Sequence, residues 1–150
     1  MPKRKLVPDV VREQEVISFK PDDMVGAAVK AMAERRVGAV LVMEGDGLKG
    51  IFTERDLVTR VVAQDLDPKT TALGQVMTAG PDTLPPDAMA IEALDLMRKH
   101  NYRHLPVLRD GAVVGIVSIR DLYAAVHAQL EQEIKERDSF IFGQDYSIGA

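Results

Sequence analysis

The stretch Gly115-Ile116-Val117-Ser118-Ile119-Arg120-Asp121 decides the fold, because the chain contains this pattern twice. The other copy, Gly50-Ile51-Phe52-Thr53-Glu54-Arg55-Asp56, lies in the first half of the chain. Each copy has a glycine, two apolar residues, a hydroxyl residue, one free position and then Arg-Asp. Each ends a predicted strand and is followed by a leucine that begins a helical pattern. The two copies therefore predict two equivalent strand-to-helix corners.

When the two halves are aligned on Gly50 and Gly115, the rest of the first half also matches the second half, and the alignment needs no gap. Prolines, aspartates at helix starts and apolar helix positions recur together: Pro21 and Pro86, Asp22 and Asp87, Met24 and Met89, Ala28 and Ala93, Met32 and Met97. A half of roughly 60 residues would bury only a marginal core by itself. We therefore expect the halves to pack together with approximate two-fold symmetry.

Each half is predicted to follow the order strand, helix, strand, strand, helix, which makes the chain a mixed α+β/α-β protein. In the first half we expect strands at 16–19, 37–43 and 48–52, a helix capped by Asp22 or Asp23, and a second helix at 55–64. In the second half the matching strands lie at 83–84, 104–108 and 113–117. The last helix continues further, because its apolar stripe runs through Leu122, Val126, Leu130 and Ile134.

These elements predict five segments: an N-terminal arm at 1–10, a first repeat at 11–65, a linker at 66–75, a second repeat at 76–130, and a helical extension with a tail at 131–150. The arm is expected to be extended, because its prolines and mixed charges show no period. The tail contains Phe140, Phe142 and Tyr146. Disordered tails are poor in aromatic residues, so we expect this one to dock on its own domain or on a second subunit.

The composition is typical of a globular protein without a basic surplus. The 150 residues are 46% hydrophobic and 28% charged, and the net charge is −4. This charge disfavours a nucleic-acid partner, and the absence of cysteine excludes disulfides and cysteine-ligated metals. No apolar run is long enough to span a membrane, and no pair of histidines has metal-ligand spacing with a carboxylate. We expect a cytoplasmic protein without a metal site and without a membrane partner.

The repeated order of elements, ending each time in Gly-apolar-x-Thr/Ser-x-x-Asp, resembles a pair of cystathionine β-synthase (CBS) domains over about residues 11–129. The strings Gly38-Ala39-Val40-Leu41-Val42 and Tyr102-Arg103-His104-Leu105-Pro106-Val107 are similar to those of stand-alone bacterial CBS pairs. The resemblance implies a regulatory sensor that binds AMP, ADP, ATP or NAD in clefts between the repeats. It also implies a flat homodimer, and a regulated partner protein that the sequence does not identify.

The corner motifs have the chemistry to hold a nucleotide. Thr53 and Ser118 lie at helix N-termini, where free backbone N–H groups and the helix dipole attract phosphate. The resemblance implies that these hydroxyls contact phosphate and that Asp56 and Asp121 contact ribose. The motif arginines, Arg55 and Arg120, can add charge-assisted contacts to phosphate. The same spacing is also that of a capping box, in which the side chains satisfy the N–H groups of their own helix.

The residues before the central strands differ between the halves. The second half has Arg103 and His104, where the family's basic residues reach phosphates, whereas the first half has Gly38 and Ala39, which leave room for a base but carry no charge. We therefore predict unequal sites, with the stronger polyphosphate contacts near Arg103, His104, Ser118 and Asp121. The alternative for His104 is an exposed residue at a strand end. Further candidates for the base pocket and its backbone are Ile17, Gly38, Ala39, Thr83, Pro106 and Ile116.

Two other functions compete with this interpretation. A scaffold with empty sites would assemble through the last helix and the aromatic tail. An enzyme, for example a nucleotide hydrolase, would use Asp56 or Asp121 with His104. The enzyme is disfavoured, because the sequence shows no nucleophile-base pair and no metal cluster.

Overall fold

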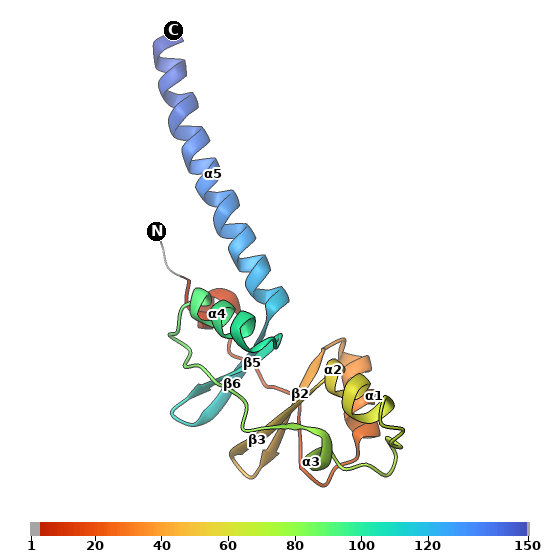
Figure 1. The fold of residues 1–150 in the computed structure, drawn as a ribbon. Coiled ribbons are helices and arrows are strands. Elements are labelled where there is room, and N and C mark those ends of the chain that lie inside the picture. Colours follow the sequence, from red (N-terminus) through yellow and green to blue (C-terminus); the bar gives the residue numbers. More distant parts are fainter. Residues whose placement is uncertain (1–3, 150) are drawn as a thin grey trace.

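The computed structural model describes residues 4–149, and their side chains as far as Ser139. The expected docking of Phe140, Phe142 and Tyr146 lies outside the described side chains. Figure 1 shows two halves side by side, with one long helix that leaves them.

The first half is built around a four-stranded sheet. Its elements are β1 (Ser18–Phe19), α1 (Val25–Arg35), β2 (Ala39–Glu44), β3 (Gly47–Thr53), α2 (Glu54–Asp56) and the helical turn η2 (Leu57–Val62). α3 (Leu73–Val76) and β4 (Thr78–Ala79) follow, and β4 adds an edge strand that the sequence pattern did not predict. The sheet order is β1-β2-β3-β4, with β1 parallel to β2 and the other pairs antiparallel.

The second half repeats this plan with a two-stranded sheet. Its elements are α4 (Ala90–His100), β5 (His104–Arg109), β6 (Ala112–Ser118) and α5 (Ile119–Gly149). In place of the predicted strand at 83–84, Leu84 forms a single parallel bridge with Val107. In the register between the halves, this bridge corresponds to the pair Phe19 and Val42 of the first half. The mixed α/β fold with two packed repeats is thus confirmed.

Each half has its own apolar core, and a smaller cluster joins the two sheets. Val40, Val42 and Phe52 are fully buried in the first core, and Leu105, Val107 and Leu122 are fully buried in the second. Between the sheets, the buried residues Ala39, Leu41 and Ile51 of the first half pack against Val113 and Ile116 of the second. Because each repeat is too small to bury a large core, this shared cluster adds to the apolar area that both halves remove from water.

The helix starts differ from the sequence prediction. Neither Asp22 nor Asp23 caps α1, since the carboxylate of Asp23 instead accepts a hydrogen bond from the backbone N–H of Lys20 at 2.7 Å. The first N–H groups of α1 donate to backbone carbonyls of the segment between the repeats, Val25 to Thr71 and Gly26 to Pro68, both at 2.9 Å. These carbonyls satisfy the free N–H groups, so α1 needs no side-chain cap.

The N-terminal segment packs on the second half through the same kind of backbone hydrogen bond by which the linker packs on the first half. The backbone N–H of Leu6 donates to the carbonyl of Ala88, as that of Leu73 donates to the carbonyl of Asp23, both at 2.9 Å. Residues 6–10 form the helical turn η1 (Leu6–Val10) beside α4 (Figure 1). The side chain of Leu6 is fully buried in the second core. The segment is therefore part of the core and not the extended arm that its lack of period suggested.

α5 projects away from both halves (Figure 1). At its base, Leu122 is buried in the second core and Ala125 is also buried, whereas Leu130 and Ile134 further along are 52% and 57% exposed. Among the helices of residues 4–149, none is both long enough and apolar enough to cross a membrane.

Candidate ligand-binding clefts

Both corner motifs form capping boxes. In the first copy, the backbone N–H of Asp56 donates to Thr53 Oγ1 at 3.2 Å, and that of Thr53 donates to Asp56 Oδ2 at 3.0 Å. In the second copy the matching distances are 3.1 Å from Asp121 N–H to Ser118 Oγ and 2.9 Å from Ser118 N–H to Asp121 Oδ2. The capping alternative is therefore present in both copies. A carboxylate has about four acceptor positions, so this geometry leaves acceptor capacity for a ligand.

A matching pair of hydrogen bonds fixes each corner beside a central strand. The N–H of Glu54 donates to the carbonyl of Gly38 at 3.0 Å, and the N–H of Ile119 donates to the carbonyl of Arg103 at 2.8 Å. The residues immediately before β2 and β5 thus lie next to Thr53 and Ser118. This arrangement brings the predicted hydroxyl, acidic and basic residues together.

Two clefts open between the halves, and each is built from both of them. The first cleft, of about 470 Å³, combines Thr53 and Asp56 with residues 80–82 and 100–104 of the second half. The second cleft, of about 730 Å³, combines Ser118 and Asp121 with residues 14–17 and 35–39 of the first half.

Most of the residues singled out from the sequence line these clefts. The first is lined by Gly38, Thr53, Arg55, Asp56, Arg103 and His104. The second is lined by Ile17, Gly38, Ala39, Arg103, His104, Ile116, Ser118, Arg120 and Asp121. Thr83 and Pro106 line neither cleft, because Thr83 is exposed outside them and Pro106 is buried within β5.

His104 belongs to the wall that the two clefts share, and it is not the exposed strand-end residue considered as an alternative. Its imidazole lies over Gly38, where an added Cβ would be only 3.1 Å from Nε2. The space beside Gly38, which has no side chain, is therefore filled by His104 and is not open for a base. Burial lowers the pKa of His104, while the carboxylates of Glu54 and Asp121 oppose that shift. The ring is thus held mainly neutral near pH 7 and faces two acidic groups.

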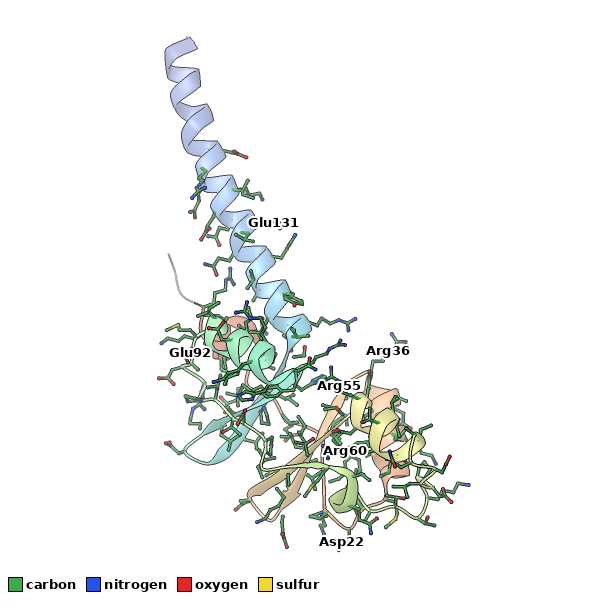
Figure 2. All side chains as sticks on the ribbon, in the orientation of Figure 1. Asp22, Arg36, Arg55, Arg60, Glu92 and Glu131 are labelled. Carbon is green, nitrogen blue, oxygen red and sulfur yellow. The ribbon has the colours of Figure 1, made fainter. Side chains whose placement is uncertain are left out.

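The two arginines that the first half contributes to the first cleft, Arg55 and Arg60, are engaged by the protein. A guanidinium N–H of Arg55 donates to the carbonyl of Asn101. Arg60 Nε lies 3.5 Å from Asp56 Oδ1, and Arg60 Nη1 donates to the carbonyl of Met77 at 2.8 Å. Figure 2 shows Arg55 and Arg60 on the side of the first half that faces the second. Although Gly38 and Ala39 carry no charge, the first half therefore does contribute two cations to the first cleft, and both are already paired within the chain.

The arginines of the second cleft are free. Arg35, Arg36, Arg103 and Arg120 line it, and none of their guanidinium groups forms a hydrogen bond or ion pair with the residues that the structure describes. Arg36 ends α1 in the left-handed conformation, with a φ of 53° (Figure 2). From the sequence, Arg35 and Arg36 indicate only an interaction with the helix dipole. No local pattern shows that the end of α1 borders a cleft whose motif lies in the other half of the chain.

The first cleft also contains a polar cluster that sequence reasoning missed. The Tyr102 hydroxyl donates to Asp82 Oδ2 at 2.9 Å, and burial together with Asp82 raises the pKa of Tyr102. The His100 ring stacks on Tyr102, with 5.8 Å between the ring centroids. Within residues 4–139, whose side chains are described, no group of three or more histidine, aspartate or glutamate residues could hold a metal ion.

Comparison with known proteins gives consistent results. The family described as "CBS domain" matches residues 8–63 and 73–128. A CBS domain-containing protein of Arabidopsis thaliana, CBSX3, which is named as mitochondrial, is 35% identical over 81% of this chain. The chain spans 62% of that relative's length and about a fifth of several other curated relatives.

Solved structures show the same likeness. A CBS-domain protein from Burkholderia ambifaria is 40% identical and has a TM-score of 0.75 over 77% of this chain and 85% of its own. A CBS domain protein from Pyrobaculum aerophilum, complexed with AMP, is 26% identical and has a TM-score of 0.70 over 79% of this chain and 89% of its own.

Proposed function

This chain belongs to the CBS domain family, and we propose that it is a non-catalytic regulatory module that binds AMP, ADP, ATP or NAD between its two repeats. The AMP complex of the Pyrobaculum aerophilum relative supports an adenine nucleotide as the ligand. The proposed repeats keep the ranges 11–65 and 76–130, with residues 4–10 added to the second. The cytoplasmic location remains a prediction.

The second cleft carries this proposal. α5 begins at Ile119, directly after Ser118, so the positive end of its dipole favours an anion at this corner. Asp121 is half-buried and forms no ion pair with any described residue, so it can accept hydrogen bonds from the two ribose hydroxyls. Ile17, Ala39 and Ile116 supply apolar surface for the base.

The charges in the second cleft fit the phosphates. Four free arginines meet three carboxylates, those of Glu15, Glu54 and Asp121. Arginine binds phosphate through two parallel N–H donors, and each charge-assisted hydrogen bond contributes about 1.5–3 kcal/mol. We therefore assign phosphate binding to Arg103 and Arg120 together with Arg35 and Arg36, which the sequence alone does not indicate.

The proposed regulatory step follows from where the nucleotide would lie. Each cleft is made from both halves, so a ligand there contacts residues that separate when the halves shift. A ligand changes a conformational equilibrium when it contacts the protein better in one arrangement of the halves than in the other. A partner protein would then respond to the arrangement that the nucleotide favours.

Titration calorimetry tests the proposal. We expect heat of binding with at least one of AMP, ADP, ATP and NAD, and much weaker binding of GMP, which has the same phosphate and ribose but a different base. Absence of heat with all four adenine nucleotides would reject the proposed function. Equal binding of GMP would reject its adenine specificity.

The pH dependence of binding provides a second test. Because burial lowers the pKa of His104, a phosphate placed near this ring should raise that pKa and cause proton uptake. The affinity for NAD, whose diphosphate does not titrate between pH 6 and 8, is therefore expected to increase several-fold as the pH falls from 8 to 6. His104→Gln should remove this slope. An affinity that is flat or falls toward pH 6 in the wild-type protein would contradict the role of His104.

A second candidate function, self-assembly through α5, is favoured by one observation. The helix extends to Gly149, and beyond its base it exposes Leu130 and Ile134 one turn apart. A helix that exposes an apolar stripe gains stability by packing on another element. We propose that this stripe contributes to a homodimer.

The dimer is tested by one change in the stripe. Ile134→Glu is expected to convert dimers to monomers, as measured by light scattering during gel filtration, because a buried carboxylate at a helix contact is strongly unfavourable. Ile91→Glu is the matched control, since Ile91 is 61% exposed on α4 and Ile134 is 57% exposed. An unchanged mass for Ile134→Glu would contradict assembly through this stripe.

A further inference from the structure

The carboxylates of the two corner motifs differ in what they can still bind. Asp56 Oδ2 accepts hydrogen bonds from both the N–H and the hydroxyl of Thr53, and Asp56 Oδ1 is 3.5 Å from Arg60 Nε. The whole residue is only 7% exposed. Asp121 accepts from Ser118, is half-buried, and has no arginine partner within residues 4–139.

This difference comes from one position. Arg60 lies four residues after Asp56, on η2, so its side chain lies one helical turn along and reaches the carboxylate. The position that corresponds to Arg60 in the second half is Ala125, whose short side chain is buried at the base of α5. The second copy of the motif therefore has no cation one helical turn after its aspartate.

Arg60 is also held from its other side. Its Nη1 donates to the carbonyl of Met77 at 2.8 Å and lies 3.5 Å from that of Val76. A ribose that approached Asp56 would have to displace a guanidinium that is already fixed by the carboxylate and by the segment leading into β4. Because the competing group belongs to the same chain, it is present at all ligand concentrations.

We propose that Arg60 is a specificity residue that blocks the ribose position of the first cleft, so that each chain binds a single nucleotide, in the second cleft. This inference rests on the proposed function and adds which cleft is used and why. It also identifies an autoinhibitory contact: breaking the pair between Arg60 and Asp56 would create a second ribose-binding site.

Calorimetric stoichiometry with AMP, ATP and NAD as probes tests the inference. The wild-type chain is expected to bind one nucleotide and Arg60→Ala two. The double variant R60A/D121A should bind one, now in the first cleft, and R60A/D56A should return to one in the second. Arg109→Ala is the matched control, because Arg109 is 48% exposed, pairs with Glu13 at 3.2 Å and lines neither cleft. It should leave the stoichiometry at one.

The outcomes separate the two proposals. Two nucleotides on the wild-type chain, or one on both wild type and Arg60→Ala, would overturn the role of Arg60 and leave the proposed function intact. No binding to either chain would reject the proposed function and this inference with it. Thermal melting of each variant shows whether it is folded. If Arg60→Ala does not fold, Arg60→Met, which keeps an apolar side chain of similar reach but has neither a charge nor a donor for Asp56, is used with the same expected results.

Discussion

Asp121→Ala is expected to weaken adenine-nucleotide binding about 100-fold. The variant removes the carboxylate that we propose accepts from two ribose hydroxyls. Each such charge-assisted bond contributes about 1.5–3 kcal/mol, where 1.4 kcal/mol corresponds to a factor of ten. The second cleft keeps its arginines in this variant, so residual binding through phosphate should remain. Titration calorimetry with AMP measures the change.

Asp56→Ala is the matched control for this prediction, because it alters the corresponding residue in the other motif copy. It removes the same capping interaction but leaves the second cleft unchanged, so the affinity should stay within about threefold of wild type, a difference of roughly 0.6 kcal/mol. Equal losses in both variants would show that the carboxylates act through stability or in two equivalent sites. Undiminished affinity in Asp121→Ala would remove this residue from the site.

Leu6→Ala is expected to lower the free energy of unfolding by about 2–5 kcal/mol, the range for a leucine that is truncated in a core. Leu6 is fully buried in the second core, and its N–H donates to Ala88 beside α4. The substitution removes apolar contacts and leaves a cavity. Urea denaturation measures the loss.

The matched control is Leu66→Ala. Leu66 is 41% exposed in the segment between the repeats, and a surface substitution of this kind changes stability by about 0.5 kcal/mol or less. If Leu6→Ala costs no more than Leu66→Ala, the N-terminal segment is not an integral part of the second core. That result would return residues 4–10 to the status of an arm.

The strands, the long helices and the corner motifs could be predicted because their signals are local. The alternation of apolar and polar residues in strands and the apolar stripes of helices each lie within one stretch of sequence. The internal repeat is found by aligning two such stretches. The N-terminal segment was misinterpreted because its prolines and mixed charges obscure the apolar pattern, and because its buried residue, Leu6, packs on residues of the second half. Its partners, Ala88 and Leu105, are distant in sequence. Likewise, no pattern shows that a backbone carbonyl of Thr71 replaces the predicted aspartate cap of α1.

The residues that line the candidate clefts are predictable to the same degree. The motif residues Ser118 and Asp121 were indicated, together with Arg103 and His104, because they lie at the corners or directly before the strands. The sequence does not indicate which of these residues line which cleft, because that depends on how the halves pack. Arg60 is the clearest example. Its partner Asp56 is one helical turn away, and the alignment of the two halves shows that Ala125 takes its place in the second half. That Arg60 lies in a cleft, however, can be seen only from the folded structure.

The most direct test of the account is a crystal structure of the full chain grown with AMP. We expect one nucleotide in the second cleft, with its ribose hydroxyls on Asp121, its phosphate beside the start of α5 and the free arginines, and Arg60 still paired with Asp56. AMP bound through Asp56 in the first cleft, with the second cleft empty, would contradict the central claim.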